Sequence, residues 1–321
     1  MLKHPLVRTA IALLIGGGAL YLAFHKQHLH QLGNELSGAN LFIIVLGTGV
    51  MFLSHLIRAW RYKMILRPIA AHTRLSSSFR ALIAGYATNN LIPRGGDIVR
   101  PLLFSKREDI PVTSSVAVLL IERLADLIGL SALLCGTMIA FHARLTEAFP
   151  SLSYLWIPIA AALGVISASA LLVLFNERKT RQVVELLGKA LPKKFRAAIK
   201  HGAARIEDGL RGIRQGTAVP VIIGTLGISV LYTASMYVST LAFPDASLAG
   251  IGFIGCFLLQ SMSGIAFILP SPGGTGTYHF FISQALVLMF SVSPETAIAF
   301  ATLTHASNYL LTSALGVIFM M

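Results

Sequence analysis

The chain has 321 residues, of which 55% are hydrophobic and only 12% are charged, and its mean hydropathy is +0.73. A soluble domain is about a quarter charged, so this composition excludes an ordinary soluble protein and indicates a polytopic helical membrane protein. The net charge of +13 fits basic loops on one side of a membrane better than nucleic-acid binding. Cys135 and Cys256 lie in apolar segments without metal-ligand spacing, so we expect no disulfide, metal or cofactor.

Six spanning helices are predicted from apolar runs of roughly membrane length. In chain order they cover about residues 5–24, 41–57, 113–141, 154–175, 219–243 and 295–319. Lys3 and Arg8 precede or begin the first run as in a signal peptide, but no small-residue cleavage site follows it. We therefore expect an uncleaved first helix.

Two basic segments set the expected orientation in the membrane. Residues 58–80 contain six Lys or Arg and no acidic residue, and residues 176–216 contain eleven Lys or Arg against four Asp or Glu. The positive-inside rule places both segments, and the N-terminus, in the cytoplasm and the nearly neutral loop 142–153 outside. The predicted location is the cytoplasmic (inner) membrane.

The second basic segment has a helical pattern of its own. Apolar residues recur at helical spacing between 183 and 213, with Pro192 near the middle and lysines on the opposite faces. This pattern predicts two short amphipathic helices on the anionic cytoplasmic leaflet. The alternative is a linker that packs on the protein itself.

Two distant stretches, 86–104 and 264–281, share one order of residues. Each has an apolar run, a proline, a Gly-Gly pair and a second apolar run, followed by another proline and a membrane-length segment. This shared order favours an internal repeat over a chance recurrence of common loop residues, and broken segments in two halves point to a transporter binding site. The prolines and glycines concerned are Pro93, Gly95, Gly96, Pro111, Pro270, Pro272, Gly273, Gly274 and Pro294.

The parity of the spans suggests how the two stretches enter the membrane. Residues 79–104 lie between two cytoplasmic points and are predicted to be a re-entrant hairpin; 247–290 are predicted to be a second hairpin, entering from outside. The alternative, that 247–269 span, remains open. The predicted fold class is an all-α polytopic membrane protein with six spans and two re-entrant hairpins. Its two inverted-topology halves, about 5–141 and 154–320, form one integral membrane domain over 1–321.

The helix at 113–141 carries three ionisable residues inside a predicted span. Glu122 and Asp126 are four apart and share a helix face, and Arg123 is three before Asp126 and can pair with it. Ionisable groups in membranes are costly and therefore suggest function. The alternative is a self-neutralising cluster that locks this helix to the first hairpin.

The first hairpin carries Arg94, Asp97 and Arg100 around Gly95-Gly96. A broken helix leaves N–H groups and a positive dipole end that suit a phosphate, and arginine adds bidentate geometry. Two further residues, Asn89 and Asn90, are expected to bond the carbonyls that the break frees. In the alternative interpretation Asp97 pairs with one of the two arginines and the group is structural.

The second hairpin lacks these charges and has Thr275, Gly276, Thr277, Tyr278 and His279 instead. His279 is a candidate proton carrier or, equally, a histidine bonded to the backbone. Matching Pro111 to Pro294 places His305 at the position of Glu122, so His305 and the nearby Asn308 are further candidates.

Four stretches together resemble the transmembrane-region family of the lysylphosphatidylglycerol synthases, also known as flippase-like membrane proteins. They are SHLIRAWR at 54–61, NNLIPRGGDIVR at 89–100, ERLADL at 122–127 and PSPGGTGTYH at 270–279. The resemblance implies a bacterial or archaeal inner-membrane protein that binds or translocates a lipid. The soluble lysine-transferring domain of the large synthases has no counterpart here, so synthase activity is not expected. Family members often carry an acid where this chain has His279.

The sequence thus predicts a flippase-like protein that binds or moves an anionic lipid, a phospholipid or a polyprenyl phosphate. Alternatives are an ion-coupled carrier of a small soluble anion and a non-transporting partner that presents lipid to a membrane enzyme. No catalytic motif is present, so we expect no enzyme; the expected partners are membrane lipids, with a protein partner or oligomer open, and not nucleic acid. The predicted substrate-binding residues are Asn89, Asn90, Pro93, Arg94, Gly95, Gly96, Asp97, Arg100, Glu122, Arg123, Asp126, Pro272, Gly273, Gly274, Gly276, His279, His305 and Asn308.

Overall fold

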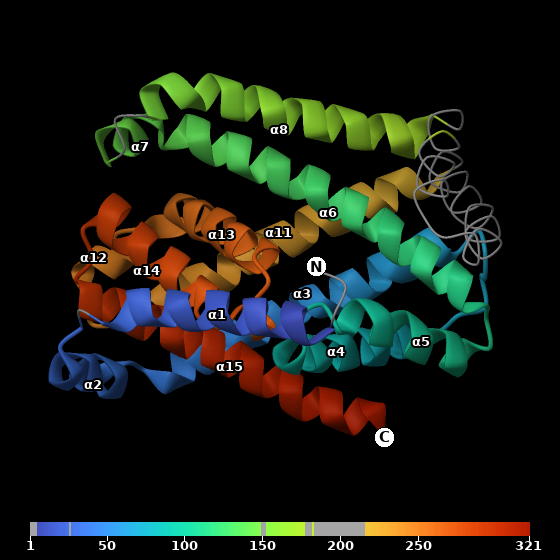
Figure 1. The fold of residues 1–321 in the computed structure, drawn as a ribbon, viewed down its shortest axis with the longest axis horizontal. Helices are drawn as coiled ribbons and strands as arrows, with labels where there is room; N and C mark the ends of the chain where they lie inside the picture. Colours follow the sequence, from blue (N-terminus) through green and yellow to red (C-terminus); the bar gives the residue numbers. More distant parts are fainter. Residues whose placement is uncertain (1–4, 26, 149–151, 177–181, 183–215) are drawn as a thin grey trace.

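The computed structural model describes residues 5–25, 27–148, 152–176, 182 and 216–321, and these residues are helical, without strands (Figure 1). The all-helical prediction is confirmed. The helices before the basic segment at 176–216 are α1 (Pro5–Phe24), α2 (Leu29–Gly38), α3 (Leu41–Leu66), α4 (Leu75–Leu91), α5 (Gly96–Glu108), α6 (Val112–Ala140), α7 (His142–Ala148) and α8 (Leu152–Phe175). After it come α11 (Ala218–Thr240), α12 (Ala246–Ala249), α13 (Gly252–Ile268), the 3-10 turn η3 (Pro272–Gly274), α14 (Thr277–Phe290) and α15 (Pro294–Met320).

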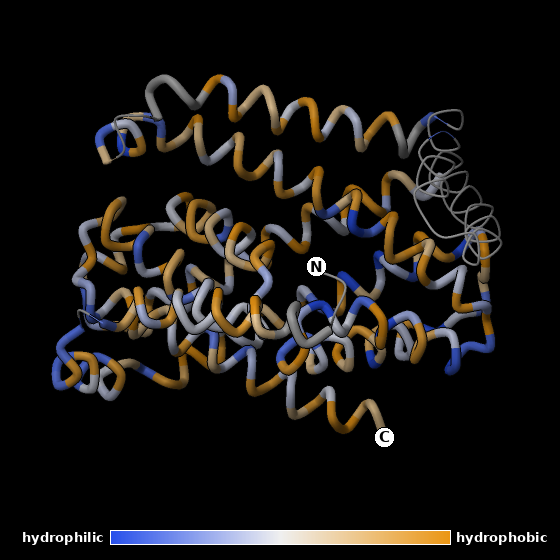
Figure 2. Tube along the Cα trace, in the orientation of Figure 1, coloured by the Kyte–Doolittle hydropathy of each residue, from blue (hydrophilic) through white to orange (hydrophobic). Residues whose placement is uncertain are grey.

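Length and apolar composition identify fewer membrane-crossing helices than the six expected. Among the described residues, α3 and α11 can cross a membrane, and a third candidate is α6 together with α7, which is bent from α6 by 80°. The apolar helices nevertheless make this a multi-pass membrane protein, as Figure 2 shows in the hydrophobic residues along α6 and α8.

Helix α3 is longer than predicted and corrects the expected cytoplasmic loop. We expected an end near residue 57, with Arg58 and Arg61 in a basic loop, but the helix continues to Leu66 and buries both arginines. Its first turn is capped by Asn40, whose side-chain oxygen accepts hydrogen bonds from the N–H groups of the next turn. The predicted loop 142–153 likewise contains α7. The amphipathic helices predicted within 177–216 lie outside the described residues, except for residue 182 and residue 216.

The helices pair in the same way before and after the basic segment. Helix α4 packs on α5 as α13 packs on α14; α5 contacts α6 as α14 contacts α15; and α3 contacts α4 as α11 contacts α13. The two sets join through a long contact between α3 and α11 and a second between α4 and α15. In Figure 1, α4 and α5 lie toward one end of the molecule and α13 and α14 toward the other.

Small residues bring the helix axes close together at these contacts. A Cβ added to Gly316 would lie 2.2 Å from the Cβ of Ala87, and one added to Gly47 would lie 2.4 Å from the Ser239 hydroxyl. In membranes, where lipid is as apolar as leucine, such close packing is a main source of helix association. The tight α4–α15 and α3–α11 contacts therefore fix the frame on which the polar residues are placed.

Candidate functional site

The first break separates α4 from α5 at residues 92–95. Arg94 has a left-handed backbone (φ 61°), a conformation that costs energy for a residue other than glycine. Just after it, a Cβ on Gly96 would lie 2.1 Å from the carbonyl oxygen of Gly85 in α4. The chain can turn back this sharply only because Gly96 has no side chain.

The N–H groups at the start of α5 are already bonded, which corrects one prediction. Asn89 accepts a hydrogen bond from the N–H of Gly96 at 2.7 Å, instead of donating to freed carbonyls. The next three N–H groups donate to the carbonyls of Arg94 and Gly95. An anion at this break must therefore be held by side chains, because the backbone donors that we expected to be open have acceptors.

The second break, residues 269–276, is covered by α1. Gly273, Gly274 and Gly276 have positive φ angles of 56°, 79° and 85°. A Cβ on Gly276 would lie 2.0 Å from the carbonyl oxygen of Gly16. The predicted glycines thus have a steric role: they let α1 lie directly on the second break.

The two predicted histidines both bond the backbone of this second break. The N–H of Gly276 donates to Nδ1 of His279 at 3.4 Å, and Nε2 of His305 lies 3.0 Å from the carbonyl oxygen of Gly273, to which it donates in the matching tautomer. The two imidazole rings lie 4.9 Å apart between centroids. This geometry agrees with the structural interpretation of His279. Asn308 does not join this group: it lines a small cavity of about 20 Å³ between α3, α11, α14 and α15.

The two breaks contact one another, although about 180 residues separate them in the sequence. The buried Asn90 side chain donates to the Tyr309 carbonyl and to two hydroxyls of α15, and the Tyr309 hydroxyl donates to the Asn90 carbonyl at 3.0 Å. A Cβ on Gly273 would lie 2.8 Å from the Asn90 amide oxygen. Arg94 reaches the Ile268 carbonyl at 3.3 Å. Asn90 therefore joins the first break to α15 and to the second break, which corrects its predicted role in its own break.

A buried charge cluster lies beside the first break, formed by Arg58 and Arg61 of α3, Arg100 of α5, and Glu122 and Asp126 of α6. Arg100 binds both oxygens of Glu122, at 3.2 and 2.9 Å, and its guanidinium lies 4.4 Å from the Tyr62 ring centroid. Arg58 bridges Glu122 at 3.2 Å and Asp126 at 2.6 Å. Arg61 contacts Asp126 at 2.5 Å and Glu122 at 3.5 Å.

Sequence reasoning missed Arg58 and Arg61 because they begin a run of basic residues. Arg61 is fully buried and the Arg58 side chain is only 11% exposed. The available signal was spacing: two arginines three apart at the end of one apolar helix match two acids four apart in another. Arg100 was predicted to hold a phosphate, but its side chain is buried and its guanidinium forms an ion pair with Glu122.

A more exposed ion pair lies at the rim of this cluster. Arg123 contacts Asp97 at 2.7 Å and Asp126 only at 3.8 Å, and the Arg123 and Asp97 side chains are 48% and 39% exposed. Asp97 therefore pairs with Arg123, and not with Arg94 or Arg100 as the structural alternative had it. Arg94, one turn before Asp97, is exposed.

The whole group carries more positive than negative charge. It contains five arginines against three carboxylates: Arg58, Arg61, Arg94, Arg100, Arg123, Asp97, Glu122 and Asp126. Since an uncompensated cation in a bundle of apolar helices is costly, this excess favours an anion near the first break. The exposed guanidinium groups are those of Arg94 and Arg123, and guanidinium matches phosphate and carboxylate geometry.

Comparison with known proteins supports the sequence resemblance. The profile of the family described as the lysylphosphatidylglycerol synthase TM region matches residues 9–316. The glycosyltransferase AglD of Haloferax volcanii is 23% identical over 312 residues, covering 88% of this chain but only 49% of that protein. The UPF0104 membrane protein MJ1595 of Methanocaldococcus jannaschii is 21% identical over 334 residues, covering 100% of this chain and 96% of that protein.

Proposed function

This chain belongs to the family of the lysylphosphatidylglycerol synthase TM region, and from that premise we propose that it binds an anionic membrane lipid at the first break and moves it across the bilayer. The observation that carries the proposal is the excess of arginine over carboxylate inside an apolar bundle, with Arg94 and Arg123 exposed at its rim. A phosphate placed there offsets positive charge that the protein leaves uncompensated. The role is non-enzymatic.

Arg94 and Arg123 are the residues assigned to the phosphate. Arg94 spends one donor on a backbone carbonyl and retains four of the five that a guanidinium carries. When the lipid binds, the Arg123 guanidinium leaves Asp97 for the phosphate, or divides its N–H donors between the carboxylate and the phosphate. Arg100 and Glu122 position α5 against α6 and do not contact the lipid in this scheme.

The lipid reaches the first break from the bilayer side. Leu91, Ile92 and Ile98 around this break are 76%, 59% and 66% exposed, whereas α1 covers the second break through Gly16 and Gly276. An arginine beside exposed apolar side chains matches a molecule with a charged head and an apolar tail. This asymmetry favours a lipid over a soluble anion, which needs a closed vestibule.

The architecture proposed for this role is a single domain of two inverted halves, with six spans, two re-entrant hairpins and a cytoplasmic N-terminus in the inner membrane. Three observations support it. The helix pairs recur in the same order in both halves, and the α4–α5 and α13–α14 pairs lie toward opposite ends of the molecule. A left-handed residue follows the proline in each break, at Arg94 and Gly273. Glu122 and His305 each connect the long helix of a half to the hairpin of that half.

A second candidate function is presentation of a lipid to a membrane enzyme without transport. It is favoured by the likeness to AglD, which is named a glycosyltransferase and of whose length this chain spans about half. The same phosphate site serves both functions, and they differ only in whether the lipid changes leaflet.

Lipid scrambling in proteoliposomes tests the proposal. Fluorescent phosphatidylglycerol should change leaflet faster with the protein than without it, and faster than phosphatidylcholine. Arg94→Gln should slow this about tenfold, since a hydrogen bond to a charged group is worth roughly 1.5–3 kcal/mol. The matched control is Arg67→Gln, an exposed arginine at the end of α3.

Three outcomes separate the possibilities. If the wild-type protein retains lipid in native mass spectrometry but causes no leaflet exchange in proteoliposomes, transport is rejected and lipid presentation is supported. Uptake of inorganic phosphate into the liposomes without lipid movement supports the soluble-anion carrier. Equal lipid retention by wild type and Arg94→Gln, at equal melting temperature, removes this arginine from the site.

A further inference from the structure

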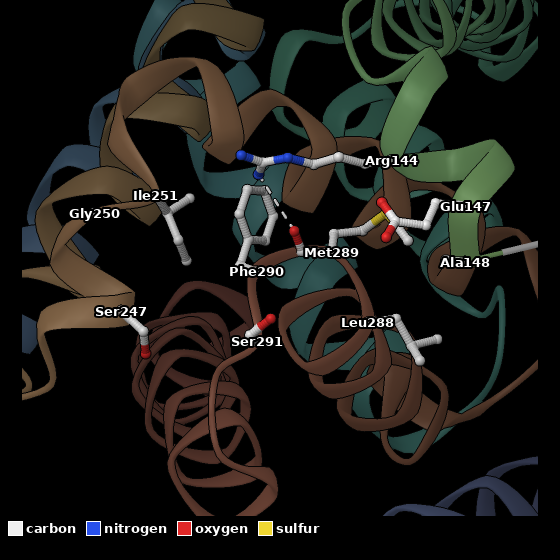
Figure 3. A pocket seen from close by; sticks show the side chains of 10 residues that line it. All are labelled: Arg144, Glu147, Ala148, Ser247, Gly250, Ile251, Leu288, Met289, Phe290 and Ser291. Atoms are coloured by element: carbon white, nitrogen blue, oxygen red, sulfur yellow. Dashed lines mark hydrogen bonds between the residues drawn. The ribbon is translucent and has the colours of Figure 1, made fainter.

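A cavity of about 490 Å³ opens between α7, the α12–α13 turn and the end of α14 (Figure 3). Its volume is in the range of small-molecule sites, and it lies at the end of the molecule away from α4 and α5 (Figure 1). It therefore shares no residue with the first break or the buried charge cluster. Its walls combine charged, hydroxyl and apolar side chains.

The positive group of the cavity is Arg144 of α7. Its Nη1 donates to the carbonyl of Met289 at 3.3 Å, and its guanidinium carbon lies 5.6 Å from the centroid of the Phe290 ring. These contacts hold the guanidinium over the ring, as Figure 3 shows, and use one of its five donors. The remaining donors suit a phosphate.

The negative group is Glu147, one helical turn after Arg144. Within the described part of the chain its carboxylate has no ion pair with Arg144 or with another cation. It lines the cavity together with Met289 and Phe290, the last residues of α14, where the helix dipole is negative. An ammonium group is the natural partner of this side of the cavity.

We propose that this cavity binds a phosphate ester that carries a primary amine, the chemistry of an aminophospholipid head group. Arg144 holds the phosphate and Glu147 the ammonium, while Ile251 and the half-exposed Leu288 contact the glycerol and first methylenes. A ligand with only one charge leaves either the cation or the anion of the cavity without a partner. The site is separate from the one proposed for transport, and its test uses different variants, so either can fail alone.

The experiment is native mass spectrometry of the whole protein in detergent, titrated with phosphatidylethanolamine or with phosphatidylcholine of the same acyl chains. Both lipids are zwitterionic, but only the first offers N–H donors to a carboxylate. Wild type should bind phosphatidylethanolamine about tenfold more tightly. Glu147→Gln should remove this preference, Arg144→Gln should weaken both lipids about tenfold, and Arg67→Gln should change neither.

A melting curve for each variant accompanies the titration, and both side chains are exposed enough for the variants to fold. Equal affinity of wild type for the two lipids, or wild-type affinity in both cavity variants, overturns the proposal. Competition by soluble O-phosphoethanolamine shows whether the site binds the lipid or the free ester. If the free ester displaces phosphatidylethanolamine at a concentration equal to that of the lipid, the site is assigned to the free ester. If a higher concentration is needed, the site is assigned to the lipid.

Discussion

Replacing Glu122 by Gln tests whether the buried charge cluster holds α3, α5 and α6 together. Glu122 is fully buried and lies within 3.5 Å of Arg58, Arg61 and Arg100. The amide keeps the shape but removes the charge, so Arg100 loses the only carboxylate that it contacts among the described residues, and Arg58 and Arg61 keep Asp126 alone. Breaking a buried ion pair from one side costs about 3–5 kcal/mol.

The effect can be measured as a melting temperature in detergent. At about 2 °C per kcal/mol for a chain of this size, Glu122→Gln should lower the melting temperature by about 6–10 °C. The matched control is Asp97→Asn, the same change in the partly exposed pair with Arg123 between the same two helices. That pair should contribute less than about 1 kcal/mol, or 2 °C.

A compensating variant separates charge from packing. Arg100→Gln together with Glu122→Gln has the net charge of the wild-type cluster, and we expect it to recover at least half of the loss. The reasoning is refuted if Glu122→Gln melts no lower than Asp97→Asn. It is also refuted if the double variant melts no higher than Glu122→Gln alone.

Two further predictions concern α1 and the orientation of the chain. Gly276→Ala should lower the melting temperature by several degrees, because its new Cβ would lie 2.0 Å from the Gly16 carbonyl oxygen and because the φ angle of this residue is 85°. The control is Gly17→Ala, whose new Cβ would meet no atom within 4 Å. This variant should have an unchanged or slightly higher melting temperature. An equal effect of the two alanines would show that α1 does not lie on the second break. Single cysteines placed in 67–74 should be labelled from the cytoplasm and those in 142–148 from outside, and labelling of both ranges from one side would contradict the inverted halves.

The local chemistry of the chain was sufficient to predict an all-helical fold and several of its long helices, but not α2, α7 or the last turns of α3. Apolar length gave α1 its observed bounds, Pro5–Phe24, and proline with paired glycines placed the two breaks at the observed turns. These features can be predicted from the sequence because the length of a span and the conformation of a turn depend on residues that are neighbours in the chain. The family was also recognisable from the same short stretches, and its profile confirms it over residues 9–316.

The partners of the polar groups were decided only by the tertiary structure. Arg61 looks like a loop residue until α6 brings Asp126 to it from 65 positions away, and Asn90 looks like a cap for its own break until α15 supplies acceptors from 219 or more positions away. Whether a charged or amide side chain faces water or is buried depends on the partner that cancels its desolvation cost. That partner comes from packing between distant helices, and the matching spacings of the arginines and acids identify it only once α3 and α6 are known to be neighbours.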